Sequence, residues 1–414
     1  MIAAGVAAID VTPPAGLAMA GFAARTQPAS GTHDRLTARA LVVGDTALLV
    51  VDVIGLDRAF CARVRDAAPL PDGNIVIQAM HTHGGPSTMP GRLSPDPDPA
   101  YMQALQSACI EAIGRAVAGR RPATLSFAMA ADPDIARNRR HADGPIDRAL
   151  PVLRVDGADG APMAVLVNYA CHPVVLGADN TLWTADYPHF VRAAIERALP
   201  GATALFLTGC IGDLNTGHSA AASLSTSGQP GRDFPTAESY GARIATNALA
   251  ASLTPLGVTA SVRNADVSLG FERREPAPPG ELAARWASEA ETADPVRATL
   301  LRHWVRWAEA VAPRPLDPLP ARVSVLDWGG MGLVGMPGEI FAATGLDLRE
   351  RIGAGPLMLA GFCEDNPGYI PPAGEYAHGG YEVDEAHRYY GQPASFAPGC
   401  AETLADTAVA LARQ

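Results

Sequence analysis

The chain has 414 residues, of which 48% are hydrophobic and 18% are charged, a composition typical of a globular protein with a hydrophobic core. The formal net charge of −11 argues against nucleic acid or an anionic membrane surface as a partner, because both require a basic surface. No stretch reaches the roughly 18 consecutive apolar residues of a membrane-spanning helix. The N-terminal segment lacks the basic and apolar regions of a signal peptide. We therefore expect a cytoplasmic protein that inserts into no membrane.

Six cysteines are scattered along the chain, and no two have the Cys-x-x-Cys spacing of a metal site. This pattern is typical of a reduced, cytosolic protein in which cysteines serve as small buried apolar residues. The 41 glycines and 36 prolines are also dispersed, which indicates many loops rather than a low-complexity tract.

Strand-like and helix-like segments alternate along the chain. Strands are predicted at 3–11, 36–43, 46–53, 74–80, 123–129, 151–155, 163–170, 202–207, 259–269, 323–328, 331–334 and 357–362. Helices are predicted at 57–68, 99–119, 187–198, 236–253, 400–412, from Glu339 to Arg351, and as a pair over 280–311 broken near Asp294-Pro295. A loop is predicted at 219–234. The alternation predicts a layered α/β sandwich around a mixed sheet, a single domain over 1–414 with a helical insertion at about 280–311.

The most informative local feature is His81-Thr82-His83, which follows an apolar strand and precedes Gly84-Gly85-Pro86. A strand end followed by such a loop can present both imidazoles to one pocket. Neutral imidazole is the commonest zinc ligand, and catalytic zinc normally takes three protein groups and a water. Taken alone, a His-x-His pair is weak evidence for a metal site.

Two more segments supply candidate ligands. His172 follows the apolar strand at 163–170, and ligands in α/β folds gather at strand ends. Glu339 stands at the predicted start of a helix, where a charge favoured by the helix dipole is the alternative explanation. Two histidines and a glutamate are nevertheless a ligand set of hydrolytic zinc enzymes.

Taken in order, the motifs of this chain resemble the catalytic domain of the neutral, non-lysosomal ceramidase family. The matching segments are 21–23, 31–36, 38–40, 81–86, 138–140, 168–173, 212–213, 337–339 and 366–381. The resemblance implies one catalytic zinc per chain, held by His81, His172, Glu339 and Tyr369. It implies that further residues contact the scissile group or the substrate: His83, Arg139 and Tyr381 as catalytic residues, with Tyr376 the alternative to Tyr381, and Gly21, His33 and Asn215 as substrate-binding residues.

The chain departs from the family pattern in two ways. Asn215 stands where the family carries a serine, which removes a hydroxyl near the reaction centre. The chain also ends soon after the tyrosine-rich stretch, without the family's C-terminal immunoglobulin-like domain. Together with the lack of a basic surface, these departures lead us to expect a small soluble substrate rather than ceramide in a bilayer.

The sequence therefore predicts a zinc-dependent hydrolase that cleaves an amide or ester bond with a metal-activated water. Arg139 or His83 would stabilise the oxyanion, and His83 could instead protonate the leaving amine. Asp186 and Asp213 either orient the histidines or cap helices and turns. The alternatives are a hydrolase of a lactone or cyclic amide, and a non-catalytic binding protein that keeps the fold. A serine hydrolase is disfavoured because no Gly-x-Ser-x-Gly elbow is present.

Overall fold

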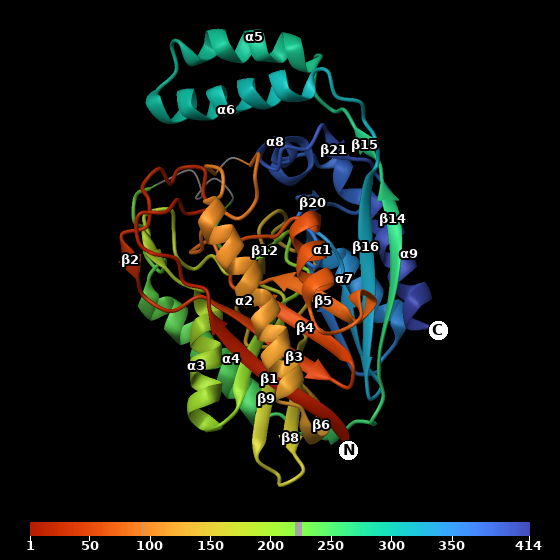
Figure 1. The fold of residues 1–414 in the computed structure, drawn as a ribbon. Helices are drawn as coiled ribbons and strands as arrows, with labels where there is room; N and C mark the ends of the chain where they lie inside the picture. Colours follow the sequence, from red (N-terminus) through yellow and green to blue (C-terminus); the bar gives the residue numbers. More distant parts are fainter. Residues whose placement is uncertain (93, 220–225) are drawn as a thin grey trace.

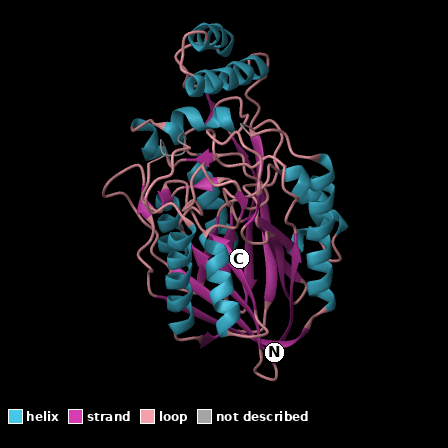
Figure 2. Cartoon of the chain, turned by 90° about the vertical axis from the view of Figure 1, so that its left-hand side faces the viewer, coloured by secondary structure: helices cyan, strands magenta, loops and turns pink. Residues whose placement is uncertain are grey.

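The computed structural model of the protein describes residues 1–92, 94–219 and 226–414 (Figure 1). Helices flank a central block of strands on both sides (Figure 2), so that two sheets lie between outer layers of helices. This arrangement confirms the predicted layered α/β sandwich with a mixed sheet. Part of the loop predicted at 219–234 lies outside the described residues.

The larger sheet is mixed, with the strand order β11-β9-β8-β6-β1-β3-β4-β5, and β13 pairs with β6 beside this path. Its strands are β1 (Ile2–Asp10), β3 (Thr37–Val43), β4 (Thr46–Val51), β5 (Ile75–Ala79), β6 (Arg121–Ala130), β8 (Leu150–Gly157), β9 (Pro162–Tyr169), β11 (Thr203–Thr208) and β13 (Thr254–Pro255). The pairs β4–β5 and β9–β11 are parallel. The predicted hairpin of β3 and β4 is confirmed, with Gly44 at φ 58° in its turn.

The smaller sheet has the order β14-β16-β17-β19, formed by β14 (Ala260–Leu269), β16 (Leu319–Trp328), β17 (Met331–Gly335) and β19 (Leu357–Ala360). Side chains on its strands alternate between two cores. Leu326 and Trp328 belong to the core shared with the larger sheet, whereas Val323 and Val325 pack in the core of α9 (Cys400–Ala412). One face of the smaller sheet therefore lies on the larger sheet and the other lies under α9.

The remaining helices lie on the outer faces of the sandwich or at one of its ends. They are α1 (Arg58–Ala67), α2 (Pro99–Ala118), α3 (Tyr187–Ala198), α4 (Phe234–Ala250), α5 (Pro279–Ala290), α6 (Pro295–Val311), α7 (Ala342–Ile352) and α8 (Ala386–Tyr389), with shorter helical turns η1 (Asp72–Asn74), η3 (Ala373–Ala377) and η4 (Tyr381–Glu385). Helix α2 packs on β1 and β3. None of the helices in the described ranges is long and apolar enough to span a membrane. The six cysteines are all buried and free.

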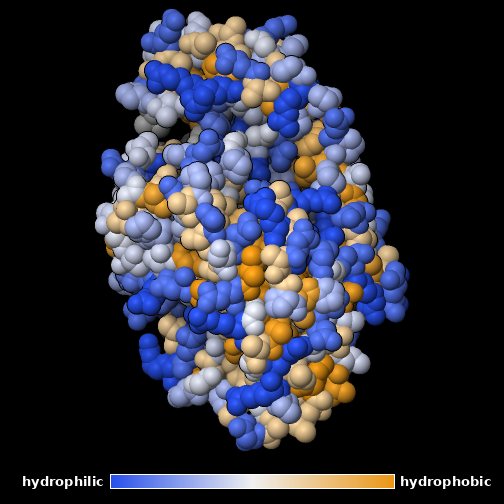
Figure 3. Space-filling view, viewed as in Figure 1, coloured by the Kyte–Doolittle hydropathy of each residue, from blue (hydrophilic) through white to orange (hydrophobic). Residues whose placement is uncertain are grey.

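Helices α5 and α6 form a hairpin that stands beyond the end of the sandwich, above α8 (Figure 1). The predicted break near Asp294-Pro295 is confirmed, because α6 begins at Pro295. Hydrophilic residues predominate on the visible face of this hairpin (Figure 3). Its apolar residues turn inward, and both Trp304 and Trp307 are buried.

Short two-residue pairings tie the loops together at the same end of the sandwich. They join β2 (Gly31–Thr32) with β10 (Leu182–Trp183), β7 (Arg137–Asn138) with β12 (Leu214–Asn215), β15 (Phe271–Glu272) with β21 (Ser395–Phe396), and β18 (Glu339–Ile340) with β20 (Tyr369–Ile370). The prediction that Glu339 opens a helix is wrong, because α7 begins at Ala342. Gly338, at φ 72°, turns the chain so that the Glu339 backbone N–H donates to the carbonyl of Gly368 instead.

Candidate metal centre

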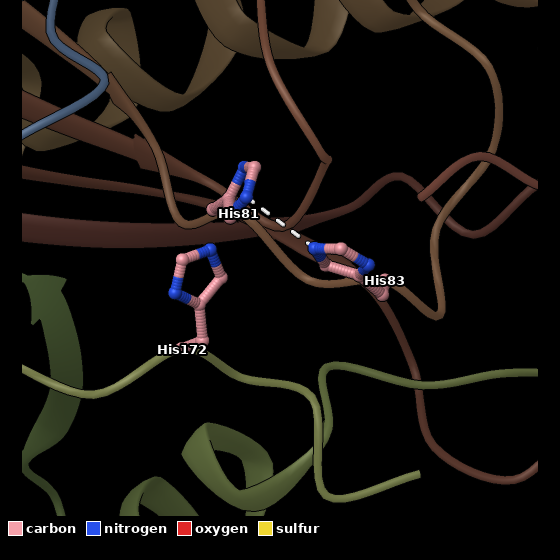
Figure 4. Close-up of side chains that lie close together, drawn as sticks. All are labelled: His81, His83 and His172. Carbon is pink, nitrogen blue, oxygen red and sulfur yellow. Dashed lines mark hydrogen bonds between the residues drawn. The ribbon is translucent and has the colours of Figure 1, made fainter. Parts of the chain in front are cut away.

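Three histidines converge where strands of the larger sheet end (Figure 4). His81 and His83 follow β5, and His172 follows β9. One ring nitrogen of each lies within 4.8 Å of the others, and the Nε2 atoms of His81 and His83 are 3.3 Å apart. His81 has φ 70°, a left-handed conformation that side chains other than glycine rarely adopt and that is concentrated at functional sites. The loop after β5 thus brings both of its rings to one place, as predicted.

Backbone carbonyls fix the tautomers of His81 and His172. The Nδ1 atom of His81 lies 2.6 Å from the carbonyl oxygen of Ile54, and that of His172 lies 2.8 Å from the carbonyl oxygen of Leu214. Because a carbonyl only accepts, each Nδ1 carries a proton. Burial lowers the pKa of His81 to about 4 and that of His172 to about 3, so both rings are neutral near pH 7. Each Nε2 therefore keeps a free lone pair.

Glu339 faces both of these lone pairs. Its Oε2 lies 3.1 Å from His172 Nε2 and 3.7 Å from His81 Nε2, and its side chain is fully buried. Two ring nitrogens and a carboxyl group thus converge in a buried site, an arrangement that a shared cation would stabilise. Two imidazole nitrogens and a carboxylate form the donor set of a divalent metal such as zinc. The residues present thus fit a metal ion.

Two tyrosines complete the surroundings of Glu339. Tyr390 donates its hydroxyl proton to Glu339 Oε1, and Tyr369 lies opposite Glu339 in the β18–β20 pairing. Arg139 donates from Nη2 to the hydroxyl oxygen of Tyr369 at 2.9 Å and from Nε to Glu382 Oε1 at 2.9 Å. Burial alone would lower the pKa of Arg139, but Tyr369 and Glu382 raise it above its ordinary value. Arg139 is therefore a permanent cation beside the centre.

A cavity of about 370 Å³ opens beside this cluster. Its lining includes these residues that the sequence singled out: Gly21, His83, Arg139, Asn215, Tyr369 and Tyr381. His83 Nδ1 has no hydrogen-bond partner among the described residues. Gly21, at φ 104°, lets the chain pass close to that ring, since a Cβ there would stand 2.6 Å from His83 Nδ1. Burial also lowers the pKa of His83 well below its ordinary value, so this ring is neutral.

The structure does not bring every predicted residue to the cavity. His33 stacks on Phe234 with ring centroids 3.7 Å apart, and it is not among the lining residues. Tyr376, the alternative to Tyr381, donates its hydroxyl to the carbonyl of Phe396 and does not line the cavity either.

Asp186 and Asp213 accept hydrogen bonds from backbone N–H groups at the starts of two helices. Asp186 accepts from the backbone N–H of Tyr187 at the start of α3. Asp213 accepts from the backbone N–H of Ala342 at the start of α7. Of the two predicted alternatives, capping is confirmed for Asp186, which is the N-cap residue of α3. Asp213 is not the N-cap residue of α7, although it accepts from the first backbone N–H of that helix.

The sequence did not predict two residues that contact the site, Glu382 and Tyr390. Both lie in or just after the tyrosine-rich stretch, and Glu382 directly follows Tyr381. Glu382 belongs to η4, a π-helical turn, and such turns are frequent at functional sites. The charged and hydroxyl side chains that directly follow the tyrosine-rich stretch were the available signal.

The chain matches a known protein family in sequence and known structures in fold. Residues 2–220 match the family model described as neutral/alkaline non-lysosomal ceramidase, N-terminal, which is more than half of the chain. The crystal structure of neutral ceramidase from Pseudomonas aeruginosa is similar with a TM-score of 0.77 and 17% identity, over 99% of this chain and 74% of that chain. A ceramidase complexed with C2 is similar with a TM-score of 0.77 and 18% identity over the same shares. At such identities the structural likeness shows a shared fold.

Proposed function

The chain belongs to the neutral/alkaline non-lysosomal ceramidase family, and from this premise we propose that it is a zinc-dependent hydrolase of amide or ester bonds in small N-acyl or O-acyl compounds. One observation carries the proposal: Glu339 Oε2 lies 3.7 Å from His81 Nε2 and 3.1 Å from His172 Nε2, the two ring nitrogens that the backbone carbonyls leave free. His81, His172 and Glu339 would hold one zinc ion, with Tyr369 as a fourth ligand. When bound, zinc supplies a Lewis acid that lowers the pKa of a coordinated water and polarises a carbonyl.

Arg139 and His83 are the residues best placed to act on the scissile group. Arg139 is charged and lines the cavity, so it can stabilise negative charge that develops on the carbonyl oxygen, an effect typically worth about 3 kcal/mol. His83 is neutral and its Nδ1 has no partner among the described residues, so it can move a proton to the leaving group. Tyr381 lines the same cavity and would orient the substrate, together with Gly21 and Asn215.

The size of the cavity supports a substrate smaller than ceramide. Its volume of about 370 Å³ lies near the lower end of the roughly 300–1,000 Å³ found for small-molecule sites. Leu300 and Trp304 of α6 contribute to its lining, so the helical hairpin encloses it on one side. A site of this volume suits a short acyl compound.

Amine release from short N-acyl amides and from ceramide tests this proposal. We expect the purified protein to hydrolyse the short amides faster than ceramide, to lose activity when a chelator removes metal, and to regain it with added zinc. His172→Ala should be inactive because it removes a proposed ligand, whereas His378→Ala, an exposed histidine that does not line the cavity, should retain activity. Hydrolysis that persists unchanged in chelator, or no hydrolysis of any amide or ester after zinc is added, would refute the proposal.

A further inference from the structure

A second cavity, of about 760 Å³, adjoins the proposed active site. The two cavities share Arg92, Ser94 and Tyr390 in their linings, so they are neighbours across these residues. Helix α6 contributes to both, with Leu300 and Trp304 on the first and Arg306 and Trp307 on the second. A substrate bound at the metal centre can therefore extend into the second cavity.

The second cavity is rich in positive charge. Arg92, Arg306, Arg314 and Arg388 line it, and among its described lining residues Asp96 is the one carboxylate. This excess is unusual in a chain whose formal net charge is −11. A cleft lined by one sign of charge concentrates ligands of the opposite sign. The cavity is therefore suited to an anionic group.

Arg92 lines both cavities, and one of its hydrogen-bond donors, Nε, has no partner among the described residues. Its guanidinium lies 5.4 Å from the centroid of the Tyr390 ring, and its Nη2 donates to the carbonyl of Asn366 at 3.2 Å. Its Nε is buried without a hydrogen-bond partner, and it forms no ion pair with a carboxylate of the described residues. Burial lowers the pKa of Arg92, although the nearby charge of Asp365 opposes that shift. A guanidinium held in place with unused donors is prepared to bind a carboxylate or another oxyanion.

Arg92 is also closely linked to the metal centre. Tyr390, on whose ring it lies, donates its hydroxyl to the proposed ligand Glu339. Tyr390 therefore contacts both Arg92, through its ring, and the proposed metal ligand Glu339, through its hydroxyl. The apolar wall formed by Leu300 and Trp304 lies in the first cavity, where the uncharged part of an acyl compound can pack.

We propose that the substrates of this protein carry an anionic group, which Arg92 binds at the mouth of the arginine-lined cavity, with an apolar portion held beneath Leu300 and Trp304. The inference rests on the proposed amide hydrolysis and narrows its substrate class to amides with a carboxylate or similar acid near the scissile bond. A neutral lipid amide has no anionic group for Arg92 to bind.

Two matched pairs of amides test the inference. The first pair is N-octanoylglycine and N-octanoylglycinamide, and the second is the N-octyl monoamide of succinic acid and its neutral diamide. Within each pair a carboxylate is replaced by a neutral carboxamide of similar size, on the amine side in the first pair and on the acyl side in the second. We expect the acid to exceed its neutral partner in kcat/KM by about tenfold or more in at least one pair, as a charge-assisted hydrogen bond would give.

Variants of Arg92 and Arg306 test whether the second cavity causes the preference for the acid over the neutral amide. The ratio of acid to neutral kcat/KM should fall toward one in Arg92→Gln and should fall in part in Arg306→Gln, an exposed position where the substitution leaves the fold intact. Arg302→Gln is the control, because Arg302 is exposed on the same helix and lines neither cavity. If neutral amides are hydrolysed as well as the acids in both pairs, or if Arg92→Gln and Arg306→Gln keep the preference, the inference is overturned while amide hydrolysis stands. If no amide or ester is hydrolysed, the proposed function itself fails.

Discussion

His81 and His172 each give an Nδ1 proton to a backbone carbonyl, so side-chain substitutions around the site leave these two acceptors in place. Glu339 differs from them, because its carboxylate depends on a side chain, the hydroxyl of Tyr390. Groups that hydrogen-bond to metal ligands fix their orientation and typically change metal affinity by about 10–100-fold. Loss of the Tyr390 hydroxyl should therefore lower the metal affinity of the site.

Tyr390→Phe tests this role. The variant removes the hydroxyl that donates to Glu339 and keeps the ring on which Arg92 lies, so zinc affinity should fall by about 10–100-fold. Competition with a chromogenic chelator measures that affinity. Tyr389→Phe is the matched control, since Tyr389 also lines the cavity but makes no hydrogen bond to Glu339. Equal zinc affinities in the wild type and Tyr390→Phe would remove Tyr390 from the metal centre.

At the scale of single residues, the sequence identified those site residues that stand in recognisable local motifs. His81, His172 and Glu339 each occur beside a strand end or a glycine turn, and the structure places the three side chains together. Tyr390 and Glu382 were missed because their partners lie 51 and 243 residues away in the chain. Such contacts are set by tertiary packing, and no local pattern contains them.

At the scale of elements, the α5–α6 hairpin packs on α8, which lies next to the proposed active site. The guanidinium of Arg388 lies within 4.6 to 5.8 Å of the ring centroids of Trp286, Trp304 and Trp307. Trp307 also donates its indole N–H to the carbonyl of Gln392 at 2.7 Å. Because α8 is followed directly by Tyr390, these contacts connect the hairpin to the tyrosine at the metal centre.

Arg388→Met should loosen the hairpin. The substitution removes three cation–π contacts, each worth on the order of 0.5–2 kcal/mol, while it keeps an unbranched side chain of similar length. Amide hydrogen exchange in α5 and α6 should become faster, and exchange in β3 and β4 should stay the same. Arg302→Met, at an exposed position of α6, provides the comparison. Unchanged protection of the hairpin in Arg388→Met would show that the tryptophan cluster holds without the arginine.

The elements differ in how far the sequence could predict them. The hairpin was predicted with its break at Pro295, because helical spacing extends over both of its helices. Glu339 was assigned to a helix because a Pro-Gly-Glu segment is typical of a helix N-terminus. It lies instead in β18, whose two residues pair with Tyr369 and Ile370 of β20. A strand of two residues has no periodicity to detect, so this pairing is visible only in the folded chain.

For the whole molecule, the packing of one sheet on the other assembles the centre. His81 and His172 follow strands of the larger sheet, whereas Glu339 follows β17 of the smaller sheet. The layered fold was predictable from the alternation of strands and helices, but the way in which the two sheets face each other was not. A bound metal would join the two sheets, and it would stabilise the folded state because it binds only the assembled site.

Elemental analysis of the wild type, Glu339→Ala and His83→Ala tests the central claim most directly. We expect about one zinc per chain in the wild type, as in mononuclear catalytic sites, zinc lost in Glu339→Ala, and zinc retained in an inactive His83→Ala. Zinc retained in Glu339→Ala but lost in His83→Ala would assign the ion to the three histidines and contradict the proposed ligand set. A wild type that holds no metal even after zinc is supplied would contradict the metal-dependent mechanism altogether.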